Sequence, residues 1–319
     1  MKLEQVLVLG GSGFVGTSLA NRLAERGLRV RIPTRRRSRA GHLLPLPTVD
    51  VVEADIHDDT ALEQLLDGVD AVVNLVAVLH SPSGKPYGPE FAKVHVDLPR
   101  RLVAACDKQG VRRLVHVSAL GAAEDAPSEY LRSKAAGEAA IRAGGRKLAW
   151  TIVRPSVIFG PGDHFLNLFA GLLRFMPLLP IGGAKARLQP VYVEDVAELL
   201  ASCLDWPEAA GQTWDAAGPR VYTLGQLVEY VGEVSDHRGL VIPLPGPVAM
   251  LQAAVMERLP NSPLSRDNLR SLQKDCVVEG EPLPFGSEPT PLEAIAPLYL
   301  SPQRRRASFF GSAQHGREF

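Results

Sequence analysis

Along the first half of the chain, short runs of consecutive apolar residues alternate with longer stretches in which apolar residues recur at helical spacing. Short apolar runs, such as Val6–Leu9, suit parallel strands that are covered on both faces. Stretches with leucine at helical spacing separate these runs, and Gly27 ends the first such stretch. The expected strands are Val6–Leu9, Arg29–Ile32, Val49–Asp55, Asp70–Ala77, Arg113–Ser118 and Ala149–Arg154, and the expected helices are Thr17–Arg26, Thr60–Leu66, Glu90–Gln109 and Tyr130–Ala143.

The alternation of strands and helices predicts a Rossmann-type α/β fold, with a doubly wound parallel sheet and right-handed crossovers. Beyond Arg154 the alternation weakens and proline becomes more frequent. We therefore expect a dinucleotide-binding domain at residues 1–154, a smaller C-terminal substrate lobe at residues 155–301 that is partly interleaved with the sheet, and a disordered tail at residues 302–319. Within the lobe the pattern predicts a short strand at Gln189–Val193 and helices at Leu166–Phe175, Asp195–Leu204, Thr223–Val234 and Val248–Leu259.

A glycine-rich turn joins the first strand to the first helix, with Gly10, Gly13 and Gly16 at three-residue spacing. The first glycine allows a tight turn, the second lets the backbone approach a pyrophosphate, and the third lets the helix pack closely on the strand. The free N–H groups at the start of the helix point at the phosphate. A plain turn is the alternative, but the position favours dinucleotide contacts from Gly10, Ser12, Gly13, Phe14 and Val15.

The segment after the second strand is basic and indicates which dinucleotide is bound. NAD-preferring folds usually place a carboxylate here, against the ribose 2′-hydroxyl, but no Asp or Glu occurs in residues 26–49. Arginine can hold a 2′-phosphate with two hydrogen bonds, so Arg35 and Arg36 favour NADP(H) over NAD(H). After the third strand, Asp55 is expected to accept a hydrogen bond from the adenine amino group, and Ile56 is also expected to contact the cofactor. A capping or turn role for Asp55, and a solvated loop for the arginines, remain the alternatives.

A candidate reaction centre lies at the start of the helix after the fifth strand. Tyr130 and Lys134 are four residues apart and share one helix face, so the ammonium group can lower the pKa of the phenol. Such a tyrosine can exchange a proton with a carbonyl or an alcohol while the nicotinamide exchanges a hydride. This pair predicts an NADP(H)-linked oxidoreductase centre.

Several motifs resemble those of the extended short-chain dehydrogenases/reductases. Besides the glycine turn and the Tyr130/Lys134 pair, they are Asn74–Ala77, Arg154–Ser156 and Val193–Ala197. Two runs, Val117–Ala122 and Tyr130–Glu138, resemble more narrowly an atypical subgroup. That subgroup contains the nucleotide-binding accessory subunit of mitochondrial complex I and its bacterial relatives. The resemblance covers about residues 1–300.

The resemblance implies a tightly held NADPH, with Lys134 on the nicotinamide ribose and Tyr130 nearby. It also implies respiratory-complex, quinone or membrane-surface partners. The further cofactor contacts that it implies are Val76, Ala77 and Val78 at the adenosine and Pro155 and Val157 at the nicotinamide. Val117 and Ser118 are also expected to contact the cofactor.

One position departs from the family pattern. Extended members keep a serine or threonine immediately after the serine that ends the fifth strand, where its hydroxyl polarises the substrate carbonyl; this chain has Ala119. Ser118 could substitute as a tentative catalytic donor, or it could make a local hydrogen bond at the strand end. The loss of one such donor costs about 10²–10³ in rate. The tyrosine and lysine are therefore expected to bind cofactor while turnover is weak or absent.

The composition excludes other classes of function. The chain has 319 residues, and its 35 basic and 35 acidic residues give no net charge, so nucleic acid is not an expected partner. Its three cysteines are far apart and indicate neither disulfides nor a zinc site. We see no cleavable signal and expect a cytoplasmic protein, or one peripheral to the inner face of the membrane. His80, His95, His116 and His164 lack ligand spacing and are expected to be surface or core residues.

The apolar segment Leu166–Met176 is expected to pack within the lobe, with a quinone-type lipid or a membrane partner as the alternative. Three functions thus remain open. The first is an NADP(H)-binding protein with little turnover in a respiratory or quinone-related role. The second is an active NAD(P)-dependent reductase, or a nucleotide-sugar epimerase or dehydratase, that uses Tyr130 and Lys134. The third is a redox-sensing regulator, whose affinity for its partner depends on the oxidation state of the bound cofactor.

Overall fold

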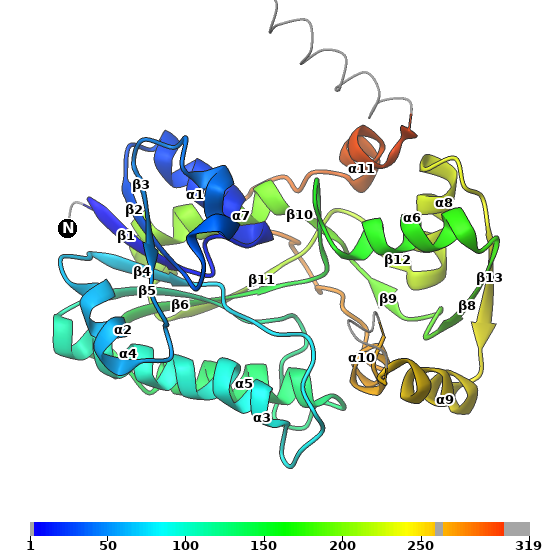
Figure 1. Ribbon diagram of the computed structural model, residues 1–319, viewed down its shortest axis with the longest axis horizontal. Coiled ribbons are helices and arrows are strands. Elements are labelled where there is room, and N and C mark those ends of the chain that lie inside the picture. Colours follow the sequence, from blue (N-terminus) through cyan, green and yellow to red (C-terminus); the bar gives the residue numbers. More distant parts are fainter. Residues whose placement is uncertain (1–2, 259–263, 303–319) are drawn as a thin grey trace, which may run out of the picture. The chain divides into compact units, whose positions relative to one another are not determined.

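The apolar runs of the first half of the chain form one parallel sheet in the computed structural model (Figure 1), which describes residues 3–258 and 264–302. Every neighbouring pair of strands in this sheet is parallel. The strand order is β11-β6-β5-β4-β1-β2-β3, so the direction of winding changes between β1 and β4. The strands are β1 (Gln5–Leu9), β2 (Arg29–Thr34), β3 (Val49–Glu53), β4 (Ala71–Asn74), β5 (Arg113–Val117), β6 (Ala149–Pro155) and β11 (Gln212–Ala216).

The predicted fold class is confirmed, and the sheet has one strand more than the sequence pattern predicts. All four residues of β4 are buried, as expected for a central strand covered on both faces. The added strand, β11, lies at the sheet edge beside β6 and is half-exposed along most of its length. An edge strand does not need a continuous apolar run, so β11 leaves little trace in the sequence.

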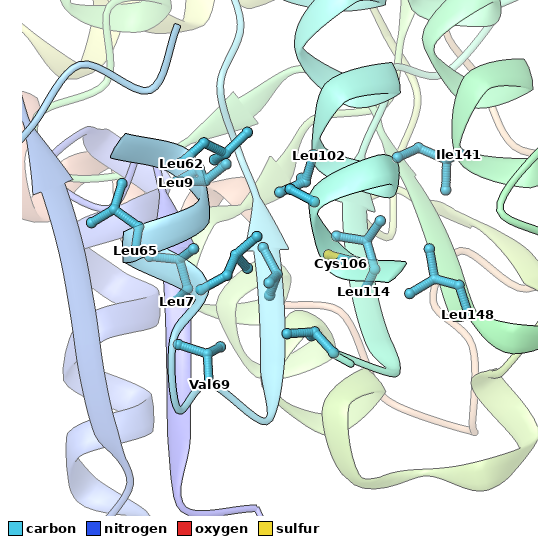
Figure 2. Packing of buried hydrophobic residues seen from close by; sticks show 14 of the residues in the cluster. Leu7, Leu9, Leu62, Leu65, Val69, Leu102, Cys106, Leu114, Ile141 and Leu148 are labelled. Atoms are coloured by element: carbon cyan, nitrogen blue, oxygen red, sulfur yellow. The ribbon is translucent and has the colours of Figure 1, made fainter. Parts of the chain in front are cut away.

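Helices cover both faces of this sheet. On one face, α2 (Asp59–Leu66), α4 (Leu98–Gln109) and α5 (Glu129–Arg142) bury a cluster of leucines against β1, β4 and β5, with Leu62, Leu102 and Ile141 pointing from the helices (Figure 2). On the other face, α1 (Phe14–Glu25) packs beside α7 (Val193–Asp205). An ion pair joins these two helices, with Arg22 Nε 3.1 Å from Glu198 Oε2.

The predicted helix Glu90–Gln109 is confirmed, and it contains a π-helical turn that the sequence pattern does not predict. The segment forms a short helix α3 (Pro89–Phe91), then a π-helical turn η2 (Ala92–Asp97), and then α4. The reason is Pro99, which has no N–H to donate to the carbonyl of His95 four residues earlier, so the backbone widens before α4 begins.

The described residues divide into two compact units. The first runs to Pro155 and takes in Val193–Ala216, a segment that falls within the predicted lobe 155–301. The second contains Ser156–Tyr192 and the described chain from Ala217 onwards. Of the tail predicted at residues 302–319, all but Pro302 lies outside the described residues.

The second unit is built from short helices and three two-stranded pairs. Its core lies between α6 (Phe165–Phe175), α8 (Leu224–Val234) and α11 (Leu292–Leu300). The strand pairs are β7 (Ile158–Phe159) with β10 (Val191–Tyr192), β8 (Leu178–Gly182) with β13 (Leu240–Leu244), and β9 (Arg187–Leu188) with β12 (Tyr222–Thr223); the remaining helices are α9 (Gly246–Met256) and α10 (Arg266–Ser271).

The expected packing of the apolar segment Leu166–Met176 is confirmed in part. Leu166 and Leu173 are buried in the core of the second unit, whereas Phe175 and Met176 are 79% and 42% exposed. Asp163 Oδ1 accepts a hydrogen bond from Leu166 N at 2.6 Å and so caps α6. Among the residues that the structure describes, no helix combines the length and apolar character needed to cross a membrane.

We predict that Gly16→Ala destabilises the first unit. A Cβ on Gly16 would overlap the carbonyl oxygen of Gly10 and lie 2.5 Å from Gly11 Cα, so the turn and the helix would have to separate. We expect a loss of about 1–3 kcal/mol in the free energy of unfolding, measured by thermal or urea unfolding. Gly41→Ala is the matched control, because a Cβ there meets nothing within 4 Å. Equal stabilities of the two variants would contradict this account of the turn.

Candidate functional site

The turn between β1 and α1 brings bare backbone to the carboxyl edge of the sheet. Gly10 has φ +81°, a conformation that favours glycine, and Gly13 N donates to Gly10 O at 3.0 Å. Helix α1 begins at Phe14, and no side chain caps it at Gly13. The N–H groups of its first turn are therefore available to an anion, as the glycine spacing predicts. Of the other predicted contacts in this turn, Ser12 and Val15 are half-buried.

The carboxyl ends of β2 and β3 form the basic side of this edge. Arg35 and Arg36 follow β2, are exposed, and have no side-chain hydrogen bond or ion pair among the described residues. Asp55 follows β3 and its Oδ1 accepts a hydrogen bond from His57 N at 2.9 Å, which is the local turn role weighed above. Burial and nearby cations, Arg35 among them, lower the pKa of His57 below its usual value. This part of the edge suits a phosphate group.

Two side chains hold the backbone of the loop after β4. Asn74 Oδ1 accepts from Val76 N at 3.2 Å, while its amide nitrogen lies 3.2 Å from His116 Nδ1. Two residues later, Val78 N donates to His95 Nε2 at 3.0 Å. The loop was predicted to line the adenosine through its backbone. Its half-buried residue Val76, like Ile56 in the loop after β3, packs on the core under α2 and α4, and Ala77 is exposed.

Helix α5 carries the predicted tyrosine and lysine. Ser128 caps the helix by accepting from Leu131 N at 3.2 Å. Lys134 is only 2% exposed, and its Nζ donates to Val117 O at 2.6 Å. Burial lowers the pKa of Lys134 to about 8, although the Glu138 carboxylate acts in the opposite direction. Tyr130 is half-buried on the preceding turn, with its ring 5.5 Å from that of His95.

The end of β5 contributes few polar groups to the candidate reaction centre. Ser118 N donates to Val153 O at 2.8 Å, and the side chain of Ser118 is buried near Glu138. Ala119 presents only a methyl group. Nearby, Leu120 N donates to Pro155 O at 3.0 Å, which places the predicted contact Pro155 at the end of the neighbouring strand. Val157, the other predicted nicotinamide contact, belongs to the second unit.

Three buried residues beside the candidate site, Glu138, His95 and His116, were not among the predicted site residues. Glu138 is 1% exposed and accepts two hydrogen bonds from Arg154, at 2.7 and 2.6 Å. Burial raises the pKa of Glu138, but hydrogen bonds, first that from Arg154, outweigh this and hold it below its usual value. The signal was present, because Glu138 lies four residues after Lys134 on the same helix face. His95 and His116 are buried, as expected of core histidines, but the hydrogen bonds of His95 with Val78 N and of His116 with the Asn74 side chain have no sequence signature.

Comparison with known proteins agrees with this geometry. The model of the family described as "NAD dependent epimerase/dehydratase family" matches residues 6–225. The mouse protein named NADH dehydrogenase (ubiquinone) 1 alpha subcomplex subunit 9, mitochondrial, is 32% identical over 90% of this chain and 77% of its own length. A Caulobacter vibrioides protein named ceramide reductase is 30% identical over 79% of this chain and 77% of its own length.

A solved structure shows the same fold at lower sequence identity. The UDP-glucose 4-epimerase of Thermotoga maritima is 19% identical, with a TM-score of 0.71, over 96% of this chain and 99% of that one. The glycine turn, the parallel sheet and the family match together identify an NAD(P)-binding Rossmann fold. The chain therefore belongs to the NAD dependent epimerase/dehydratase family of extended short-chain dehydrogenases/reductases, as a relative of the alpha subcomplex subunit 9 of mitochondrial NADH dehydrogenase.

Proposed function

We propose that this protein holds NADP(H) tightly, has little or no turnover, and serves a respiratory complex or a quinone-related process. The observation that carries the proposal is Ala119, which puts a methyl group where the family's reaction needs a hydroxyl. The relative named as a subunit of NADH dehydrogenase supports the link to respiration. On this proposal the protein is cytoplasmic and associates peripherally with the inner face of the membrane.

The site offers a matching group for each part of the dinucleotide. The backbone at Gly10–Val15 and the N-terminus of α1 would hold the pyrophosphate. The guanidinium groups of Arg35 and Arg36 would hold the 2′-phosphate, and the remaining carboxylate oxygen of Asp55, after β3, would accept a hydrogen bond from the adenine amino group. The loop Val76–Val78 would line the adenosine, and Lys134 would bind the nicotinamide ribose.

Reduction of a carbonyl would need a hydride, which NADPH supplies when bound, and a proton, which Tyr130 can donate to the carbonyl oxygen. Lys134 stabilises the resulting phenolate by its charge. A hydroxyl beside Tyr130 would complete the centre by polarising the carbonyl, and Ala119 lacks it. The loss of such a donor lowers the rate about 10²–10³-fold, so cofactor binding would persist without useful catalysis.

An active NADP(H)-dependent reductase is the second candidate. The observations that favour it are the Tyr130/Lys134 pair on one face of α5 and the relative named ceramide reductase.

We predict that Arg35→Ser shifts the cofactor preference. Losing a charge-assisted hydrogen bond to the 2′-phosphate costs about 1.5–3 kcal/mol, so NADPH should bind about 10–100-fold more weakly while NADH is unaffected. Fluorescence titration or calorimetry measures both affinities. Arg29→Ser is the control, because Arg29 is an exposed arginine at the opposite end of β2. A protein that binds neither dinucleotide at millimolar concentration would overturn the proposed function.

We also predict that Ala119→Ser raises the rate of NADPH oxidation on a panel of carbonyl substrates by about 10–100-fold above an almost inactive wild type. Stopped-flow absorbance at the nicotinamide band measures the rate, and Tyr130→Phe in the Ala119→Ser background should remove the gain. Rapid turnover by the wild type that Tyr130→Phe abolishes would instead establish the second candidate.

A further inference from the structure

His95 lies in the π-helical turn η2, buried between two aromatic rings of the candidate site. Its ring is stacked on Phe91 at 5.4 Å with an angle of 18° between the planes. Its edge contact is with Tyr130, at 5.5 Å and 82°. Only 2% of the residue is exposed. The imidazole therefore packs between the Phe91 ring and the Tyr130 ring.

The hydrogen bonds of His95 determine its tautomer. Val78 N–H is a donor, and it lies 3.0 Å from His95 Nε2, so Nε2 must be the unprotonated acceptor. His95 Nδ1 then carries the proton and donates to Ser133 Oγ at 2.8 Å. The hydroxyl of Ser133 in turn donates a hydrogen bond to Tyr130 O at 2.7 Å. A directed chain of three hydrogen bonds thus runs from the loop after β4 to the backbone of Tyr130.

Two further features stabilise this series of hydrogen bonds. The π-helical turn carries His95 on the segment before Pro99, and a Cβ added at Gly137 of α5 would overlap the carbonyl oxygen of His95. The backbones of η2 and α5 therefore approach each other closely. Burial, and then the charge of Lys134, lower the pKa of His95 to about 2, so the imidazole is neutral at physiological pH. A neutral ring is what the bond from Val78 requires.

We propose that His95 is a positioning residue that couples the Val76–Val78 loop to the helix carrying Tyr130 and Lys134. The inference rests on the proposed function, because it assumes that the loop and the helix contact opposite halves of one bound dinucleotide. His95 touches neither substrate nor cofactor in this assignment. When the adenosine half of the dinucleotide binds and restricts the loop, the hydrogen bonds of His95 restrict helix α5 as well. Tyr130 and Lys134 are thereby held in position for the nicotinamide half.

His95→Phe tests the coupling, because it retains a ring between Phe91 and Tyr130 and removes both hydrogen bonds. We expect the dissociation constant for NADPH to rise about tenfold, and that for 2′,5′-ADP, which lacks the nicotinamide half, to rise by less. Ser133→Ala should weaken NADPH binding in the same way but by less. The loss of binding free energy in the double variant His95→Phe/Ser133→Ala should be smaller than the sum of the losses in the two single variants. His95→Gln, whose amide can both accept and donate, should recover part of the affinity.

Two control variants separate positioning from general stability. Leu148→Ala removes a buried core side chain at the amino end of β6, and Ser202→Ala removes a hydroxyl from α7, where it bonds to Glu198 at 3.2 Å. Both should change the unfolding midpoint without changing the ratio of the NADPH and 2′,5′-ADP affinities. If His95→Phe leaves that ratio unchanged as well, the positioning role is overturned and His95 is a packing residue.

A measurement on the wild-type protein covers the case in which His95→Phe does not fold. Long-range ¹H–¹⁵N NMR should show His95 as the neutral Nδ1–H tautomer between pH 5 and 8, with its ¹⁵N shifts moving when NADPH binds. A protonated ring, the Nε2–H tautomer, or shifts unchanged by NADPH would overturn the inference. Failure of the wild type to bind NADPH would instead overturn the proposed function, so the two failures are distinguishable.

Discussion

The close approach of bare backbone at the first turn is the constraint on which the site depends. At Gly10 the chain reverses with φ +81°, and at Gly16 the helix lies so near the turn that no Cβ fits. The unpaired N–H groups of α1 thereby lie at the carboxyl edge of β1, beside β4, where the winding of the sheet changes direction. Most other candidate contacts in the first unit lie at or just after the carboxyl ends of the neighbouring strands, and Lys134 reaches Val117 at the end of β5 from helix α5.

Polar groups buried behind that edge give the site its rigidity. Asn74 and His95 hold the loop after β4 through Val76 and Val78, while Val117 O holds the ammonium group of Lys134. Each of these groups would be costly to bury alone, because an unpaired polar group loses its hydrogen bonds to water. Paired as they are, they restrict the loop and α5 to one arrangement, which suits tight cofactor binding more than rapid exchange.

A few side chains on α5 and at the end of β5 bear on whether the site can catalyse a reaction or only bind a cofactor. Tyr130, Lys134 and Glu138 line one face of α5, and Arg154 neutralises the buried carboxylate, so the helix is built as it would be for proton transfer. The methyl group of Ala119 removes the donor that would polarise a carbonyl. The fold of the NAD dependent epimerase/dehydratase family does not by itself decide between binding and catalysis, which depend on such single side chains.

The sequence by itself determined the parallel sheet, the glycine turn, the basic end of β2 and the tyrosine–lysine pair, because apolar period, glycine spacing and helical spacing are local properties of the chain. It missed β11, whose half-exposed edge position needs no apolar run, and the π-helical turn η2 inside the predicted helix, where Pro99 interrupts the regular hydrogen bonding. Only the tertiary structure could bring His95 to Val78 and Arg154 to Glu138. Those contacts join residues far apart in the chain, and their strength comes from burial, which no local pattern encodes.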